Sequence, residues 1–287
     1  MSYEEKTAKW EFYDQKFEYE QIIDPLETGW YGHVFFAYDL VRNMRPERIV
    51  ELGTHKGHSF FTFCQAVKDG CLDTELFAID TWKGDKHAGF YDDSVWETVN
   101  QVKESFYDSL RINLIRKNFD SAADGFGDQS IDILHIDGCH TYEAVKNDFE
   151  RWVGKVKDNG VILLHDINER QNDFGVFRLW DELIKQYKTL EFYHSHGLGV
   201  LCKHTQGFSE IFDFSRIWRG YYPLKMDKKF LTINNQKKDL EISHLKDLTQ
   251  QKDQEIAQKD QEIDAMKSTK FWKLRTLYAS IMQFIRH

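Results

Sequence analysis

The sequence predicts an α/β fold: a doubly wound, mostly parallel sheet of seven strands, with an antiparallel last hairpin and a C-terminal coiled-coil-like helix. Between residues 48 and 205, short and continuously apolar runs alternate with amphipathic helical stretches. Continuous apolarity means that a strand is buried on both faces, as in a parallel sheet covered by helices. Two further observations complete the prediction. TLEFYHSHGLGVLCKH has a tight turn near His196–Gly197, and residues 251–264 repeat one heptad almost unchanged.

The elements follow in order along the chain. Residues 1–47 predict an N-terminal helical cap, because the apolar residues after Trp30 have a helical spacing that stops at Arg45–Pro46. The ligand-binding domain at 48–205 takes its strands from the runs RIVELG, ELFAID, INLIRK, IDILHID and GVILLHD. Its helices come from SFFTFCQAVKDG, YEAVKNDFERWVGKV and FGVFRLWDELIKQY. Residues 206–235 are expected to connect this domain to the C-terminal helices.

The C-terminal region predicts two helices of different character. At 236–267, Ile242, Ile256 and Ile263 share one heptad position, but polar residues also occupy the seam, so a homo-oligomer formed through this segment should be weak. At 268–287, apolar residues recur at helical spacing beside basic residues that no acid opposes. This last helix is expected either to lie on an anionic membrane surface or to dock on protein.

Composition excludes several function classes. The formal net charge of −9 argues against a nucleic-acid partner, since phosphate neutralisation needs a basic field. The first residues lack the pattern of a signal peptide, and no run of about 18 apolar residues is present to span a bilayer. We therefore expect a cytoplasmic protein, peripheral at the inner membrane surface if the last helix binds lipid. Cys64, Cys71, Cys139 and Cys202 show no C-x-x-C pairing and are expected to be reduced.

A glycine-containing turn follows the first predicted strand. IVELGTHKGHSF runs from a strand through Gly53 and Gly57 into a helix, where an open α/β sheet binds its ligand. Glycines there allow the backbone to approach a ligand closely. A nicotinamide-dependent enzyme would need G-x-G-x-x-G, whereas this chain has Glu51-x-Gly53-x-x-x-Gly57. A carboxylate beside the turn favours a ligand with a cationic or hydroxyl-bearing part over a pyrophosphate.

The second strand ends in an acid. Asp80 is placed to accept the hydroxyls of a ribose, and the indole of Trp82 could cover an adenine face. The alternative is that Asp80 caps a helix and Trp82 packs in the core.

Together these residues resemble the class I S-adenosylmethionine-dependent methyltransferases over roughly residues 45 to 205. ELGTHKG is similar to their first motif and AIDTW to their second. DTWKGDKHAGFY, HIDGCHTYEAVKNDFERW, GVILLHD and HGLGV further resemble the subfamily found with glycosyltransferases, which is related to macrocin-type and aminocoumarin-type sugar O-methyltransferases. The resemblance implies a Rossmann-like methyltransferase fold, S-adenosyl-L-methionine as cofactor and a sugar or lipid-linked glycan as acceptor. The cofactor contacts that it implies come from Glu51, Gly53, Thr54, Gly57, Asp80, Thr81, Trp82 and Asp137.

Polar residues also follow the predicted fourth strand, in HIDGCHTYE. Methyl transfer to a hydroxyl requires that the oxygen be oriented and its proton removed. A histidine can take that proton and a divalent ion can lower the hydroxyl's pKa, so His140 is the candidate base and Asp137 a candidate metal ligand. His135, inside the strand, is expected to pack in the core.

The resemblance also implies a metal site. In the related sugar O-methyltransferases, an acid matching Asp137 and an acidic pair matching His165 and Asp166 hold magnesium, and a histidine matching His140 is the base. Here His165 replaces an acid, which shifts the expected ion from Mg toward Mn. Some relatives place an acid base where Cys139 stands, but a neutral thiol cannot fill that role.

Alternatives remain open at this point. Asp137 could cap the following helix, with His140 on the surface and His165–Asp166 fixing a loop. The whole protein could be a methyltransferase acting on a sugar hydroxyl in glycan or polysaccharide biosynthesis, a non-catalytic scaffold in a glycan-synthesis complex, or a nicotinamide-dependent oxidoreductase.

Overall fold

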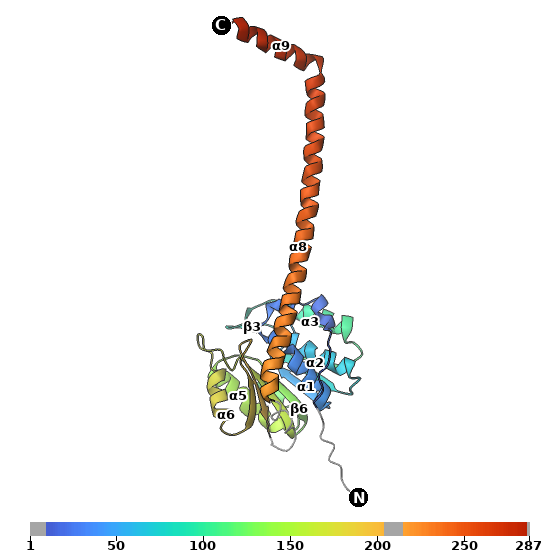
Figure 1. The fold of residues 1–287 in the computed structure, drawn as a ribbon. Coiled ribbons are helices and arrows are strands. Elements are labelled where there is room, and N and C mark those ends of the chain that lie inside the picture. The colour runs from blue at the N-terminus through green and yellow to red at the C-terminus, as the bar shows by residue number, and fades with distance from the viewer. Residues whose placement is uncertain (1–9, 204–214, 286–287) are drawn as a thin grey trace. The chain divides into compact units, whose positions relative to one another are not determined.

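The structure, a computed structural model, describes residues 10–203 and 215–285 (Figure 1). The chain divides into two compact units, Met1–Asp227 and Lys228–His287. Each unit is considered by itself below. All the residues predicted to form the ligand-binding site belong to the first unit.

The first unit is built on a seven-stranded sheet with the order β5-β2-β1-β6-β7-β9-β8. These strands are β1 (Arg48–Leu52), β2 (Glu75–Asp80), β5 (Arg111–Arg116), β6 (Ile131–Ile136), β7 (Val156–His165), β8 (Lys188–Phe192) and β9 (Leu198–Cys202). The first five strands of this order pair in parallel, and β9 runs antiparallel to both β7 and β8. The predicted sheet and its terminal hairpin are confirmed. The order reverses direction beside β1, so the ends of β1 and β6 form the crevice in which such sheets bind ligands.

Helices cover both faces of the sheet (Figure 1). On one side lie α1 (Val34–Met44), α2 (His58–Asp69) and α3 (Ser94–Phe106); on the other lie α4 (Phe119–Ala123), α5 (Tyr142–Trp152) and α6 (Val176–Leu183). The second set shares one core with the sheet, which includes Leu134, Trp152, Leu164 and Leu179. The helix α1 ends at Arg45, which has a left-handed φ of 51° ahead of Pro46, as the sequence predicts. A short hairpin of β3 (Gly84–Asp85) and β4 (Gly89–Phe90) follows β2.

The first turns of α8 (Ser215–Ser268) belong to the first unit, which differs from the predicted boundaries. Trp218 is fully buried against Trp10, with ring centroids 4.2 Å apart. The Tyr222 hydroxyl donates to Asp39 (2.8 Å) and accepts from the Trp10 indole (3.0 Å). The connector predicted at 206–235 is therefore helical from Ser215 onward and its helix starts about 20 residues before 236, while residues 206–214 lie outside the described part. Aromatic anchors spread over the first turns of the helix explain the difference, because they follow no heptad.

The second unit contains the rest of α8 and α9 (Lys270–Ile285), a helix in the segment where the sequence predicts one. The predicted apolar stripe of α9 is exposed in this unit, with Leu274, Leu277 and Ile281 between 48% and 64% accessible. Among the described helices, none combines the length and apolarity needed to cross a bilayer.

Candidate active site

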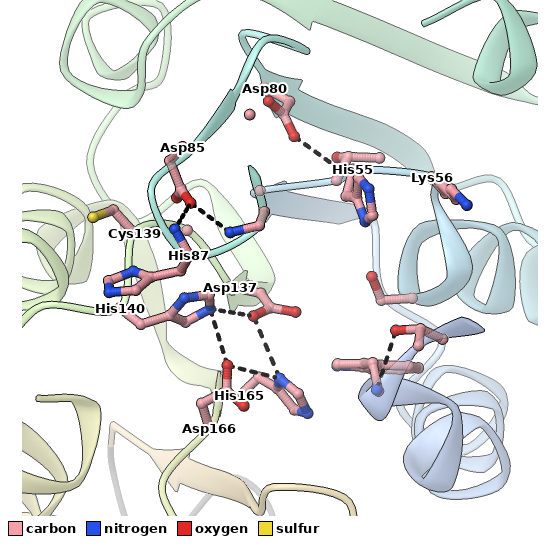
Figure 2. A pocket seen from close by; sticks show the side chains of 18 of the residues that line it. His55, Lys56, Asp80, Asp85, His87, Asp137, Cys139, His140, His165 and Asp166 are labelled. Atoms are coloured by element: carbon pink, nitrogen blue, oxygen red, sulfur yellow. Dashed lines mark hydrogen bonds and ion pairs between the residues drawn. The ribbon is translucent and has the colours of Figure 1, made fainter. Parts of the chain in front are cut away.

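A cavity of about 580 Å³ opens at the carboxyl ends of β1, β2 and β6. It is lined by the turn after β1, by Asp80 at the end of β2 and Thr81 after it, and by residues 137–140 after β6. His165 and Asp166 complete it from the end of β7. Figure 2 shows Asp137, His140, His165 and Asp166 gathered together, with His55 and Lys56 across the cavity. The sheet thus brings into one cavity residues that are more than 100 positions apart in the chain.

Both glycines of the first turn line the cavity, and the backbone of the turn also requires them. Gly53 and Gly57 have φ angles of 92° and 89°, in the left-handed region that favours glycine. A Cβ on Gly53 would lie 2.0 Å from the carbonyl oxygen of Asp137, and one on Gly57 would lie 2.5 Å from the Phe61 ring. The glycines are therefore required by the turn and by its packing. Thr54, between them, is buried and also lines the cavity.

Asp80 holds the turn in place. One carboxylate oxygen accepts the backbone N–H of His55 (2.8 Å) and the other accepts that of Trp82 (2.8 Å). Asp80 still lines the cavity, as Thr81 does. Because a carboxylate has about four acceptor positions, Asp80 retains capacity for a ligand hydroxyl.

The prediction that Trp82 covers a ligand ring is wrong in this structure. Its side chain is fully buried and is not among the residues that line the cavity. The indole N–H donates to the carbonyl of His55 (2.9 Å), and the ring packs on Trp96 at 4.6 Å. A left-handed φ of 50° at Trp82 turns the side chain into the protein. Trp82 is therefore a core aromatic residue, which was the alternative considered for it. It supports the turn through its bond to His55, on the side away from the cavity.

Glu51 also lies beneath the cavity instead of lining it. It is fully buried, and its carboxylate accepts from His135 Nδ1 at 2.8 Å. The other ring nitrogen of His135 receives the indole N–H of Trp30 (3.0 Å). An indole nitrogen can only donate, so His135 Nε2 is an acceptor and the proton sits on Nδ1. Glu51 therefore has no surface on the cavity in which its ligand contact was predicted. His135 is a core histidine, as predicted, and it also fixes the Glu51 carboxylate.

The residues at the ends of β6 and β7 form a compact charged group. His140 Nε2 lies 2.9 Å from Asp166 Oδ2 and 3.4 Å from Asp137 Oδ1. His165 Nδ1 lies 3.4 Å from the same two oxygens, and its Nε2 contacts the carbonyl oxygen of Ser195 at 3.1 Å. Asp166 has a left-handed φ of 62°, which turns its carboxylate back toward the histidines. All four residues predicted for catalysis or metal binding therefore meet.

This arrangement excludes the purely structural alternative for two of these residues. Thr141, not Asp137, caps α5: its hydroxyl accepts the N–H of Ala144 (3.4 Å). The His140 side chain is only 16% exposed and stacks on Phe174, with centroids 4.8 Å apart. Asp137 is thus not a cap, and His140 is not a surface residue.

Charge pairing dominates the protonation of this group. Burial opposes a charge on His140, but hydrogen bonds and attraction from Asp137 and Asp166 outweigh burial and raise its pKa to about 10. The same balance raises the pKa of His165 to about 10. Burial would raise the pKa of Asp166, but His165 and His140 lower it to about 2, and they hold the pKa of Asp137 well below its usual range. Two carboxylates are therefore balanced by two imidazolium groups at neutral pH.

The same donor atoms suit a divalent ion. One donor atom from each of Asp137, His140 and Asp166 lies within 4.8 Å of the others. The contact of His165 Nε2 with the Ser195 carbonyl directs Nδ1 toward the carboxylates, as is usual for metal-bound histidines. A set of two oxygens and one or two nitrogens fits manganese better than magnesium.

Sequence reasoning missed the hairpin that covers the cavity. Gly84, Asp85, His87 and Tyr91 line it from the β3–β4 hairpin, and Phe174 lines it from the segment before α6. The apolar and charged residues of these two segments recur at no regular spacing, so the sequence pattern did not indicate that they bind a ligand. His196 does reach the cavity, whereas the His194 ring contacts the carbonyl oxygen of Gly32.

Comparison with known proteins agrees with this geometry. Residues 50–167 match the family model described as a methyltransferase domain. Over 180 residues, or 63% of this chain, the sequence is 47% identical to a protein of Sinorhizobium fredii described as uncharacterized protein y4gI. The chain spans only 20% of the length of that curated relative.

Solved structures with a similar fold are more distant in sequence. A methyltransferase from Geobacter sulfurreducens is 18% identical, with a TM-score of 0.47 over 59% of this chain and 77% of that one. The O-methyltransferase TomG from Streptomyces achromogenes, solved with S-adenosylmethionine, is 13% identical, with a TM-score of 0.45 over 63% of this chain and 90% of that one.

Proposed function

We propose that the protein is an S-adenosylmethionine-dependent O-methyltransferase that acts on a sugar hydroxyl in glycan or polysaccharide biosynthesis. The observation that carries the proposal is one cavity that joins the Gly53–Gly57 turn and Asp80 to the pair of His140 and Asp166. The methyltransferase-domain match over residues 50–167 supports it. The sugar acceptor rests on the sequence resemblance alone.

The chain's own residues suit the cofactor. The turn after β1 presents backbone where the cofactor's methionine part would lie, and Asp80 has acceptor capacity left for a ribose hydroxyl. Trp82 and Glu51 would act indirectly, Trp82 by supporting the turn and Glu51 by fixing the floor of the cavity. The Asp137 and Asp166 carboxylates would favour a cationic sulfonium nearby once the histidines beside them had released a proton.

In the proposed reaction, the acceptor oxygen attacks the methyl carbon as the sulfur–carbon bond breaks, and the hydroxyl proton passes to His140 Nε2. In the ligand-free protein this nitrogen holds a proton at neutral pH, because its pKa is about 10. A bound sulfonium would add positive charge nearby and so lower the pKa of His140, which would favour release of that proton before reaction. The stack on Phe174 then keeps the neutral ring in its orientation.

We also propose that Asp137, His165 and Asp166 hold a divalent ion, with His140 Nε2 within reach of the same position. A bound ion would supply Lewis-acid lowering of the acceptor hydroxyl's pKa. An ion and a proton would compete for the same imidazole nitrogens. A bound ion and a basic His140 are therefore alternative ways to promote loss of the acceptor hydroxyl's proton. Chelator-insensitive activity would reject the ion.

The proposal is tested first by calorimetry of the full chain with S-adenosylhomocysteine and with NAD. We expect binding of S-adenosylhomocysteine only, and loss of that binding in Asp80→Ala. The matched control is Asp73→Ala, whose carboxylate is 92% exposed and does not line the cavity. Binding of NAD alone would refute the proposal in favour of an oxidoreductase. Cofactor binding without methyl transfer to any glycan fraction would favour the scaffold.

A further inference from the structure

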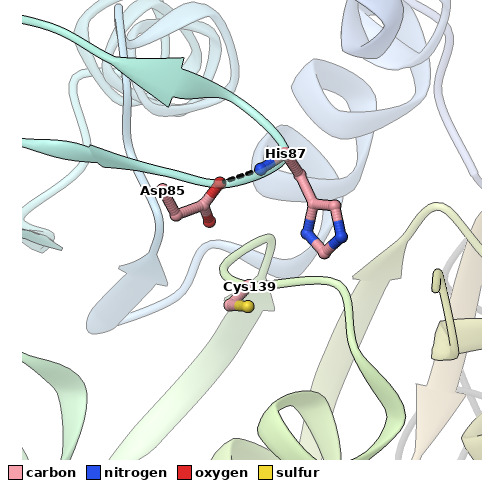
Figure 3. A group of neighbouring side chains, drawn as sticks. All are labelled: Asp85, His87 and Cys139. Atoms are coloured by element: carbon pink, nitrogen blue, oxygen red, sulfur yellow. Dashed lines mark hydrogen bonds between the residues drawn. The ribbon is translucent and has the colours of Figure 1, made fainter. Parts of the chain in front are cut away.

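A second group of metal-ligating side chains lies in the cavity beside the charged group at Asp137, with the His87 ring centroid 5.4 Å from that of His140. Asp85 comes from β3, His87 from the hairpin turn, and Cys139 from the loop after β6 (Figure 3). One donor atom from each lies within 4.8 Å of the other two. Imidazole, thiolate and carboxylate together are a zinc-type donor set, whereas magnesium takes oxygen ligands. The three residues share no sequence motif, which explains why the pattern was not visible in the sequence.

The histidine of this group is oriented as a metal ligand is. Its side chain is only 6% exposed, and Nε2 contacts Asp173 Oδ1 at 2.7 Å. The other ring nitrogen, Nδ1, is buried and has no hydrogen-bond partner among the described residues. A buried nitrogen without a partner is costly, and binding an ion would remove that cost. A carboxylate that fixes the far nitrogen is the usual companion of a metal-bound histidine.

The other two ligands are also held in place. Asp85 Oδ1 accepts the N–H groups of His87 (2.7 Å) and Ala88 (2.8 Å), which fixes its carboxylate beside the imidazole. Cys139 is a free, partly buried thiol. Donor atoms about 2.0–2.3 Å from one zinc ion stand roughly 3.3–3.8 Å apart, so shifts of about 1 Å would close the group around an ion.

We propose that Asp85, His87 and Cys139 bind a zinc-type divalent cation, with Asp173 holding the histidine. Cys139, which cannot serve as the acid base found in some relatives, would then be a metal ligand. All three ligands line the cavity, so a fourth position would face the bound molecules, as in zinc sites that keep one position open. Lys86 also contacts the Asp173 carboxylate, but its side chain is 53% exposed and can turn away from a bound cation. The proposal does not depend on the methyltransferase function.

Cobalt(II) provides the test, because a thiolate ligand gives an intense charge-transfer band in the near ultraviolet. The Asp137, His140 and Asp166 group contains no sulfur and cannot produce that band. We expect the full chain, stripped of metal, to develop the band with one equivalent of cobalt and to lose it on adding zinc. Cys139→Ser should abolish the band, and Cys71→Ser, a change at an exposed cysteine outside the cavity, should leave it intact. No band in the unmodified chain, or a band that persists in Cys139→Ser, would overturn the proposal.

Two further measurements do not depend on the folding of that variant. In the unmodified chain, one equivalent of zinc should slow alkylation of Cys139 and leave Cys71 unchanged; equal rates at Cys139 with and without zinc would overturn the proposal. Asp173→Asn should weaken cobalt binding by about 10- to 100-fold. Lys86→Gln, the matched control, removes the other partner of the same carboxylate and should bind cobalt at least as tightly. Unchanged affinity in Asp173→Asn would remove Asp173 from the site.

Discussion

Raising the pH from about 7.5 to about 8.5 should destabilise the ligand-free first unit through His140 and His165. Both histidines have pKa values raised to about 10 from an ordinary 6.5. A raised pKa means that the folded protein holds protons which the unfolded chain has released. The resulting stabilisation is complete below pH 6.5 and is lost as the pH rises toward 10.

The slope of the unfolding free energy against pH is proportional to the number of protons that only the folded state holds. Each proton held only by the folded state gives about 1.4 kcal/mol per pH unit, so two histidines give a fall of about 2.7 kcal/mol over the unit. Burial of Asp39 and Asp148 raises their pKa values to about 7, which confines their largest effect to lower pH. The window from about 7.5 to about 8.5 therefore reports mainly on His140 and His165.

Urea unfolding with chelator present, followed by tryptophan fluorescence, measures this slope. Every tryptophan except Trp272 precedes residue 228, so the signal reports the first unit. His140→Asn should halve the slope. The control His194→Asn should leave it unchanged, because burial lowers the pKa of His194 and its ring is neutral in this window. A flat profile in the unmodified chain, or equal slopes in it and in His140→Asn, would refute the charge balance described for the site.

Three other predictions follow from the same geometry. His140→Asn should lower methyl transfer to glycan, measured with labelled cofactor, by about two to four decades, and should retain S-adenosylhomocysteine affinity. Full activity in this variant would remove His140 from the mechanism. Manganese binding at pH 7 should release between one and two protons, seen as a dependence of the calorimetric heat on buffer ionisation, and a heat independent of buffer would place the ion elsewhere. Anionic liposomes should bind the full chain more tightly than a chain ending at residue 267, and equal binding would reject the membrane role of the last helix.

The sheet and the gathering of the site residues were predictable because both follow from burial and topology. Apolar runs such as IDILHID can only be strands buried on two faces, and parallel strands bring their carboxyl ends to one edge. Asp80 ends such a strand, and Asp137 and Asp166 each follow one directly, so the fold alone fixes their proximity. The start of α8 at Ser215 was less predictable, since scattered aromatic contacts decide it.

Side-chain direction at the strand ends could not be predicted. Glu51 and Trp82 stand at positions where a ligand contact is reasonable, yet both turn inward. For Trp82 the reason is a left-handed backbone, which residue type does not reveal. For Glu51 the reason is His135, a partner 84 positions away that becomes a neighbour only through pairing of β1 with β6. Local pattern therefore identifies which strand ends carry polar groups, and the partners of those groups decide which of them reach the cavity.

The charges of the two carboxylates and the two histidines of the site depend on one another, although these residues come from separate segments of the sequence. Asp137 and Asp166 lie close together and largely buried, so they require about two positive charges nearby. In the ligand-free protein His140 and His165 supply both as imidazolium groups. A sulfonium or a divalent ion bound in the cavity would bring positive charge of its own and would favour release of protons from the histidines. Binding of the proposed cofactor would in this way convert His140 from an acid into a base, and the base would form only when the methyl donor is in place. On the proposed function, the pKa of about 10 would couple cofactor binding to catalysis, because His140 would lose its proton only when the methyl donor is bound.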